Sequence, residues 1–383
     1  MTVRVSKPAF NLRDKLSELD KPTGIKGTEL MRSETSQEVR DLIGAGRRNK
    51  LFNGAMQVAQ RGTSFTSVGA SANTFTLDRW KFYIQNSTAR FTVSKDSESP
   101  DGFGGSMKID CTTTDTSLAS TDEVYLEQRL EGQDLQDFAK GTRSAKEYTL
   151  SFYVKTNKLG TYIVNLLGRD NTTSTCSAAY TVNDTNWNRY TVIFPADPSS
   201  GRTDDNDNGE ALRVLWWFVA GSAVNTTTLA TTWRNSTDTG RAAGQINFAD
   251  STSNEFFLTG CQLEVGRNVT EFEHRSFAEE LALCQRYFQS NFPTGVAPQN
   301  GYYNANSGLA AGFNGAVCFS ADNLRSPWVM FRPKMNHQPD VTLYSASTSD
   351  DANKWSAYKG SWDSGSSNTI DYFGNQGFGV RYG

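Results

Sequence analysis

Apolar residues recur at every second position through most of residues 51–275, and this alternation limits the possible fold more than any other feature. Successive side chains of a β-strand point to opposite faces, so a period of two predicts strands with one buried face. Gly, Asn, Asp and Ser turns separate about eight such runs, which predicts an antiparallel β-sandwich of the jelly-roll type. The runs contain Ala89, Phe91 and Val93; Met107, Ile109 and Cys111; Val124 and Leu126; Tyr148, Leu150, Phe152 and Val154; Tyr190, Val192 and Phe194; Leu212, Val214, Trp216 and Phe218; Ile246 and Phe248; and Thr259, Cys261, Leu263 and Val265.

Residues 1–50 differ in character from the alternating region. Eleven Lys and Arg and seven Asp and Glu give these residues a net charge of +4. The whole chain has a net charge of −3, so residues 51–383 carry −7. Two short helices are predicted here, and helices this short need a partner surface. That surface is either the β body of the same chain or another protein. The apolar residues expected to dock are Phe10, Leu12, Leu16, Leu19, Ile25, Leu42 and Ile43.

A single helix is predicted over residues 276–290, beginning at Ser276 and running to about Gln289. The residues Phe277, Leu281, Cys284 and Phe288 are spaced four, three and four apart, which is typical of an a/d seam. Such a short seam is compatible with two arrangements. It lies at a threefold axis between copies of the chain, or it packs against the sandwich.

The sequence of residues 291–383 predicts a second, smaller β domain. Its five short strands are expected around Val317 and Phe319, Trp328 and Met330, Val341 and Leu343, Ile370 and Tyr372, and Phe378 and Val380. This is a thin core for its length, and thin cores are often completed by copies of the same chain. We therefore expect copies of the same chain to complete this core.

Composition excludes several classes of protein. The net charge of −3 shows no basic excess for nucleic acid, and no apolar run approaches the length of a membrane helix. Five scattered cysteines and only two histidines argue against a zinc site. The odd cysteine number and the absence of an apolar leader predict reduced, mostly buried thiols in a chain made in a cytoplasm.

One segment is rich in oxygen ligands. Asp204, Asn206 and Asn208 are a weak calcium candidate, but position 12 of the loop is Leu215 where a calcium-binding EF-hand needs Glu. An Asn-Gly turn explains the same residues. Otherwise no cofactor is expected.

No catalytic motif is present, and we expect a protein that is not an enzyme. The chain lacks a nucleophile elbow and a phosphate-binding loop. A glycosidase needs only two carboxylates, which sequence spacing does not exclude. The parallel β-helix that many polysaccharide-cleaving proteins use is not predicted, because the sequence has no solenoid period.

Aromatic residues are the expected sugar contacts, because flat rings stack on pyranose faces. Trp216 and Trp217 lie in a strand that is apolar on both faces, and Trp187 precedes a strand, so all three are expected to be structural. A C-terminal set lies in loop-like sequence, where binding residues concentrate. The alternative for this set is packing in a trimer interface. The set comprises Trp355, Tyr358, Trp362, Tyr372 and Phe373.

A series of short motifs follows in order along the chain. They are RRNKLFNGAMQVAQRGT (47–63), TLDRW (76–80), YLEQRLEG (125–132), LSFYVK (150–155), TNW (185–187), GCQLEVG (260–266), TEFEHR (270–275) and LALCQRYF (281–288). Two further motifs, KPAFNLR (7–13) and KPTGI (21–25), open the chain, and a weaker similarity occurs at FRPKM (331–335) and PDVTL (339–343).

This order of motifs resembles marine bacteriophage tail-fibre and virion structural proteins, including those of cyanophages. The resemblance implies a jelly roll similar to carbohydrate-binding modules, carried on a fibre that is usually a trimer. We therefore expect a homotrimer in which residues 291–383 are either distal and receptor-facing or trimerising. It also implies that residues 1–50 dock to the particle through other tail or adaptor proteins, and that the virion is where the protein resides. A host cell-surface glycan is then the expected ligand. A head fibre without receptor binding and a depolymerising tailspike are the alternatives.

Overall fold

The structure is a computed structural model that describes most of the sandwich and parts of the C-terminal region. The described residues are 32, 39, 48–70, 73–226, 228–290, 292–299, 303–304, 309–310, 317–318, 324–325, 329–342, 356–358, 362–364 and 368–382.

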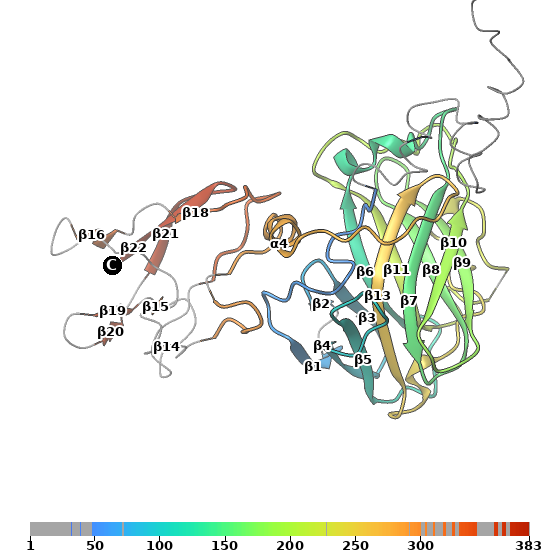
Figure 1. Cartoon of the computed structure of the whole chain (residues 1–383), viewed down its shortest axis with the longest axis horizontal. Coiled ribbons are helices and arrows are strands. Elements are labelled where there is room, and N and C mark those ends of the chain that lie inside the picture. The colour runs from blue at the N-terminus through green and yellow to red at the C-terminus, as the bar shows by residue number, and fades with distance from the viewer. Residues whose placement is uncertain are drawn as a thin grey trace, which may run out of the picture.

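Six antiparallel strands form the first sheet of the sandwich (Figure 1). Their apolar side chains alternate with polar ones, as in β7, where Phe152 and Val154 are fully buried and Tyr153 and Lys155 are partly exposed. The order across the sheet is β1 (Ser64–Val68), β4 (Arg90–Asp96), β5 (Ser106–Thr113), β13 (Glu255–Val265), β7 (Tyr148–Thr156) and β10 (Asn188–Phe194).

Seven antiparallel strands form the second sheet. Its longest strand, β11 (Glu210–Ala220), lies at its centre and keeps its register with the neighbouring β6 (Glu123–Glu131) except at two irregularities. The order across the sheet is β12 (Arg234–Asn235), β9 (Ser174–Val182), β8 (Gly160–Gly168), β11 (Glu210–Ala220), β6 (Glu123–Glu131), β3 (Lys81–Gln85) and β2 (Asn73–Phe75).

The main core lies between the two sheets and is rich in aromatic rings. Trp216 packs edge-to-face against Trp80, with ring centroids 5.4 Å apart, and against Phe152, at 5.7 Å. All three side chains are fully buried. Aromatic side chains bury the most apolar area per residue, so these rings contribute strongly to the stability of the sandwich. The predicted core role of Trp216 is confirmed.

A second apolar layer covers part of the outer face of the seven-stranded sheet. Val224, Leu229 and Ala242, from the loop between β11 and β13, pack against Trp217 and Ile163 of that sheet. Trp217 is 1% exposed, so its predicted structural role is also confirmed.

The prediction of a strand at Ile246 and Phe248 is wrong. Phe248 begins a short 3-10 helix, η3 (Phe248–Asp250), in which the Asn247 side chain accepts a hydrogen bond from the Ala249 N–H at 2.9 Å. Phe248 is fully buried and Ile246 packs partly against the core. A helical turn thus buries Phe248, and Ile246 precedes this turn in irregular backbone, so their spacing of two does not come from a strand. Two further 3-10 turns, η1 (Gly132–Asp134) and η2 (Gln136–Phe138), follow β6.

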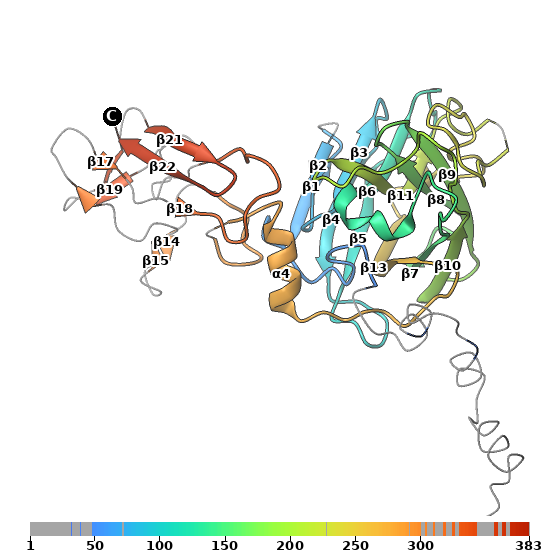
Figure 2. The ribbon, with the colours of Figure 1, turned by 90° about the horizontal axis from the view of Figure 1, so that it is seen from above.

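Helix α4 (Phe277–Gln285) lies between the sandwich and the C-terminal strands in both views (Figures 1 and 2). The Ser276 hydroxyl caps it by accepting from the Glu279 N–H at 3.3 Å. The helix ends four residues earlier than predicted, and a tighter turn follows it in which the Tyr287 amide donates to the Cys284 carbonyl three residues back.

Short antiparallel strands make up the described C-terminal region. The longest pair, β21 (Asn368–Gly374) and β22 (Gly377–Tyr382), is a hairpin. The strand predicted around Val341 and Leu343 is not found at 341–342, which lie outside any strand, while 343 is outside the described residues. The remaining strands are β14 (Tyr303–Asn304), β15 (Leu309–Ala310), β16 (Val317–Cys318), β17 (Leu324–Arg325), β18 (Val329–Met330), β19 (Ser356–Tyr358) and β20 (Trp362–Ser364).

The predicted mainly-β chain with an antiparallel sandwich is therefore confirmed, while the homotrimer and the docking segment stay predictions. Four cysteines, Cys111, Cys176, Cys261 and Cys284, are buried free thiols, as expected. Among the described residues, no helix has the length and apolar character that crossing a bilayer requires.

Candidate functional site

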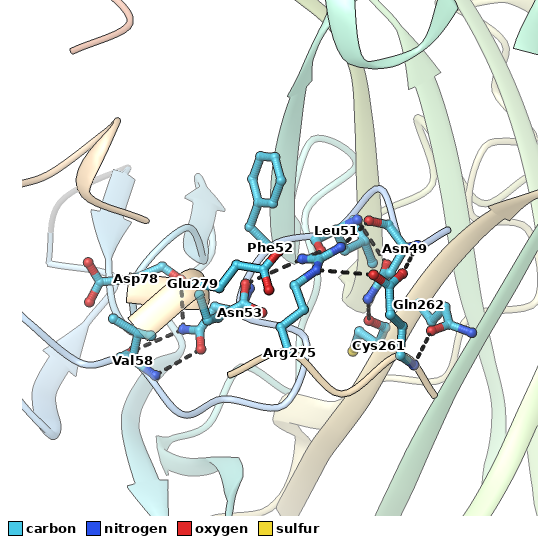
Figure 3. A network of polar contacts seen from close by, with 12 residues as sticks. Asn49, Leu51, Phe52, Asn53, Val58, Asp78, Cys261, Gln262, Arg275 and Glu279 are labelled. Carbon is cyan, nitrogen blue, oxygen red and sulfur yellow. Dashed lines mark hydrogen bonds and ion pairs between the residues drawn. The ribbon is translucent and has the colours of Figure 1, made fainter. Parts of the chain in front are cut away.

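A polar network joins the start of the sandwich to β13 and to the segment before α4 (Figure 3). The backbone amides of Arg48 and Asn49 both donate to Glu273 Oε2 at 2.7 Å. Asn49 Nδ2 donates to the Cys261 carbonyl at 3.0 Å, and Arg275 donates to the carbonyls of Leu51 and Asn49. The motifs 47–63, 260–266 and 270–275 thus meet in one place, and these contacts are structural.

A second set of contacts, next to this network, holds α4 and the turn after it against the sandwich. The Arg79 guanidinium lies 3.3 Å from the ring centroid of Tyr287. Glu131, at the end of β6, accepts from Arg286 Nε at 2.9 Å and Nη2 at 2.8 Å, and also from the Tyr287 hydroxyl. The motifs 76–80, 125–132 and 281–288 therefore supply contacts that fix the helix to the body of its own chain. We call these contacts, together with the polar network, the junction.

The junction accounts for half of the predicted trimer seam. Cys284 is buried within this chain, and Phe288 lies beneath the Arg61 guanidinium at 3.7 Å. Burial also raises the pKa of the Cys284 thiol. These two residues therefore pack on the body of their own chain. Phe277 is 46% exposed and Leu281 is partly exposed, so a threefold contact through them stays a prediction.

The outer face of the six-stranded sheet carries the strongest candidate for a binding site. Two side chains that alternation turns away from the core here, Tyr153 of β7 and Phe257 of β13, are aromatic. Rings from three segments outside the strands join them: Phe103 before β5, Trp187 before β10, and Phe272 with His274 after β13. We call this group the aromatic patch, and it comprises Phe103, Tyr153, Trp187, Phe257, Phe272 and His274.

Phe103 is the centre of one half of the patch. Its ring centroid lies 5.3 Å from that of Tyr153, 5.1 Å from Phe272 and 5.2 Å from His274. Phe103, Tyr153 and Phe272 are partly exposed, and His274 is exposed. Such a group of rings reaches solvent while its members hold one another in place.

Gly260 allows Phe103 and Tyr153 to come together. It has φ of +62° and lies in an irregularity of β13 between Thr259 and Gln262. A Cβ at this position would lie 2.8 Å from both Phe103 Cζ and Tyr153 Cδ2. Only glycine fits both the backbone conformation and the close approach of the two rings.

Charged groups surround the other half of the patch. Trp187 packs edge-to-face on Phe257 at 6.2 Å, and the ammonium groups of Lys108 and Lys155 lie 5.5 and 5.7 Å from the Phe257 ring. Lys108 also pairs with Glu255 at 2.7 Å. Rings beside cations and carboxylates can stack on a sugar and donate to or accept from its hydroxyls.

Sequence reasoning placed the sugar contacts elsewhere and missed most of this patch. Trp187 was expected to be structural, and its packing on Phe257 agrees with that, although its side chain is partly exposed. The alternation of β7 points Tyr153 outward and is a signal that the sequence contains. Phe103 and Phe272 come from loops, and no periodicity marks them.

The predicted C-terminal sugar contacts are placed only in part. Tyr358 and Trp362 are directly opposite each other in the β19–β20 hairpin, and Tyr372 and Phe373 lie in β21. Trp355 lies outside the described residues. The backbone therefore brings Tyr358 and Trp362 together, and sugar binding by the whole set stays a prediction. The predicted docking residues Phe10, Leu12, Leu16, Leu19, Ile25, Leu42 and Ile43 also lie outside the described residues.

The weak calcium candidate has other partners in the structure. Asp204 pairs with the buried Lys140 at 3.1 Å, and burial raises the pKa of the Asp204 carboxyl despite this cation. The Asn208 amide donates to the Asn336 carbonyl, and Asn206 is exposed. Within the described ranges, no group of three or more His, Cys, Asp and Glu side chains is arranged to hold a metal ion.

Comparison with known proteins gives matches only among solved structures. No protein-family model matches the chain, and none of the curated proteins matches it.

Three of the similar structures are a phage tailspike domain and two carbohydrate-binding domains. The enzymatically active domain of tailspike protein 4 of Bacteriophage CBA120 is 10% identical with a TM-score of 0.30, and the match covers 57% of this chain and 21% of that one. The family 11 carbohydrate-binding module of Clostridium thermocellum is 11% identical with a TM-score of 0.27, covering 55% and 97%. The CBM22-1 xylan-binding domain from Paenibacillus barcinonensis is 12% identical with a TM-score of 0.28, covering 59% and 100%.

The chain thus spans about a fifth of the tailspike chain and nearly the whole of each module. At these scores the similarities are too distant to carry an argument about function. The class of protein is defined by the chain's own two antiparallel sheets, which form a β-sandwich.

Proposed function

We propose that the chain is a structural component of a bacteriophage virion, a trimeric tail fibre that adsorbs to glycans on the host surface. The observation that carries the adhesive role is the aromatic patch, because it presents several partly exposed rings beside charged groups on one face of the sandwich. The C-terminal aromatic residues are a second proposed contact region, distal to the particle.

Binding by such a patch is weak at each chain and strong in the assembly. A flat outer face with a few stacking rings buries little of a sugar, so a single contact is expected to be modest. Three chains in each fibre and several fibres on each particle raise the effective concentration and give avidity without a tight single site.

The virion role is supported by the order of motifs, and the structure gives those motifs a physical meaning. Six of them meet in the junction that fixes α4 and the following turn to the sandwich. A chain that must transmit force from a docked end to a distal end needs such a rigid connection. Residues 1–50 are proposed to dock to tail or adaptor proteins.

The adhesive role is tested by measuring glycan binding to the purified full chain, using host surface polysaccharide in affinity electrophoresis. The double variant F103A/F272A removes two patch rings that come from loops. I193A is the matched control, because Ile193 is 43% exposed and is turned to the same side of β10 as Arg189, outside the patch.

We expect wild type and I193A to be retarded equally and F103A/F272A to lose most of the retardation. Equal retardation of all three proteins would overturn the patch as the binding site. Absence of binding by wild type would favour the architectural head-fibre alternative. Release of oligosaccharides during the incubation would favour the depolymerase alternative and contradict the proposed absence of enzymatic activity.

A further inference from the structure

A group of charged side chains lies on the outer face of the other, seven-stranded sheet. Lys81 of β3 is directly opposite Glu127 of β6, and Arg129 of β6 is directly opposite Arg213 of β11. Arg169 follows β8, where its amide donates to the Ala211 carbonyl at 2.8 Å. We call the four cations Lys81, Arg129, Arg169 and Arg213, with Glu127 and Glu210, the cationic cluster.

Glu127 is the buried centre of the cluster. Its side chain has no exposed surface, and it pairs with Arg129 at 2.8 Å, Lys81 at 3.3 Å and Arg213 at 3.4 Å. A buried carboxylate needs such partners, because an unpaired one would be expensive to desolvate. One carboxylate is thus shared by three cations.

Glu210 links the remaining cation to the others. It pairs with Arg213 at 2.5 Å, Arg129 at 2.8 Å and Arg169 at 3.5 Å. The six side chains therefore carry four positive and two negative charges, an excess of two positive charges. The whole chain carries −3, so this excess is a local feature.

The positive charges are not all enclosed. The side chains of Arg129 and Arg169 are 36% and 40% exposed. Glu127 and Glu210 each pair with both Arg129 and Arg213, so the two carboxylates offset the repulsion between these opposed guanidinium groups, while the cluster keeps its excess of two positive charges. Guanidinium groups with remaining N–H donors bind carboxylate and sulfate oxygens in a forked geometry.

Aromatic surface adjoins the cations. In the next row of the sheet, Tyr83 stacks on Tyr125 with ring centroids 4.6 Å apart, and Tyr83 remains partly exposed. Phe75, directly opposite Lys81 on β2, is 50% exposed. A flat ring beside a guanidinium suits a pyranose that carries an acidic substituent.

We propose that the cationic cluster binds the anionic substituents of an acidic polysaccharide, either the carboxylates of uronic acids or sulfate esters. The ligand is a glycan, as in the proposed function, but the binding site is different. It lies on the opposite sheet from the aromatic patch and shares no residue with it.

The test uses the full chain, with polygalacturonate, dextran sulfate and neutral dextran as probes in isothermal titration calorimetry. The variant R129Q/R169Q removes two partly exposed cations, and R169Q alone removes one that has a single long ion pair. R267Q is the matched control. Arg267 follows β13 outside the cluster, its side chain is 73% exposed, and it pairs with Glu147. Melting temperatures show whether each variant is folded.

We expect the wild type to bind at least one of the two polyanions and not dextran. R129Q/R169Q should weaken this binding about tenfold or more, R169Q less, and R267Q should leave it unchanged, as expected for loss of charge-assisted hydrogen bonds. Raising the salt concentration should weaken binding by the wild type more than by R129Q/R169Q. Preference for polygalacturonate would assign uronates, and preference for dextran sulfate would assign sulfate esters.

Two results would overturn the inference. The first is no binding of either polyanion by the wild type. The second is an equal loss in R129Q/R169Q and R267Q, which would show that binding follows total charge alone. The patch variant F103A/F272A should retain polyanion binding, so failure of the adhesive patch and failure of the cationic cluster are separate outcomes.

Discussion

Gly260 is the single residue on which the aromatic patch depends most directly. G260A should lower the free energy of unfolding by about 2–4 kcal/mol, because it adds strain at positive φ to a collision with two rings. Chemical denaturation measures this change. It should also reduce glycan retardation, since Phe103 and Tyr153 must separate.

Gly266 provides the control for that substitution. It also has positive φ, +97°, but an added Cβ would meet no atom within 4 Å. G266A should therefore cost only about 1 kcal/mol and leave glycan binding intact. If the two variants behaved alike, crowding of Phe103 and Tyr153 at Gly260 would not be the cause.

Glu131 gives the junction a dependence on pH. Burial alone would raise the pKa of this carboxyl, but hydrogen bonds from Arg286 and Tyr287 outweigh burial and hold its pKa below the ordinary value of 4.5. The unfolded chain then binds more protons than the folded chain in this range, so the stabilisation by Glu131 is present above about pH 4.5 and is lost on acidification.

E131Q should accordingly lower the free energy of unfolding at pH 7 by about 1–3 kcal/mol, because it removes charged hydrogen bonds to a partly buried arginine. It should also flatten the loss of stability between neutral pH and pH 3. Denaturation curves at several pH values measure both effects. An unchanged slope in E131Q would show that other carboxylates cause the acid sensitivity.

At the scale of elements, helix α4 and the turn after it separate two roles that the predicted seam combined. Cys284 and Phe288 pack on their own chain, while Phe277 and Leu281 keep exposed surface. If the chain is a trimer in which this face meets its copies, F277E should reduce the mass in solution from three chains to one without lowering the stability of the sandwich.

Val269 offers a matched control, because it is 39% exposed in the loop after β13. V269E should leave the mass unchanged, as measured by light scattering. A trimer that persists in F277E would place the contact elsewhere, in the C-terminal strands or in residues 1–50.

Alternation predicted the strands that have one face in the core and one toward solvent, such as β4, β5 and β7. It missed β8, in which seven consecutive residues are buried, and also β9. The loop after β11 covers part of the outer face of this sheet, so β8 has no polar side to mark its period. The sequence does not show that cover, because it comes from residues far along the chain.

The candidate site was predictable to a smaller extent. The outward direction of Tyr153 follows from the period of β7, but Phe103 lies in a Gly-rich loop and Phe272 in a segment without regular structure. Only the fold brings them within contact of Tyr153. Patches assembled from loops on a rigid sheet depend on long-range contacts that local patterns do not contain.

At the scale of the whole molecule, residues 1–50 are proposed to connect the chain to the particle. Deletion of residues 1–47 should leave the sandwich folded, because it keeps Arg48 and Lys50, whose amides donate to Glu273 and to the Leu263 carbonyl of β13. The melting temperature should be close to that of the full chain, but the shortened protein should fail to enter particles. Its appearance in purified virions would place the docking surface in another part of the chain.

Adsorption of the purified full chain to host cells tests the central claim most directly, with wild type, F103A/F272A and I193A compared at equal melting temperature. We predict that wild type and I193A bind to the cells, compete with each other, and release no oligosaccharide, while F103A/F272A binds at a small fraction of the wild-type level. Undiminished binding of F103A/F272A would contradict the aromatic patch as the adhesive surface.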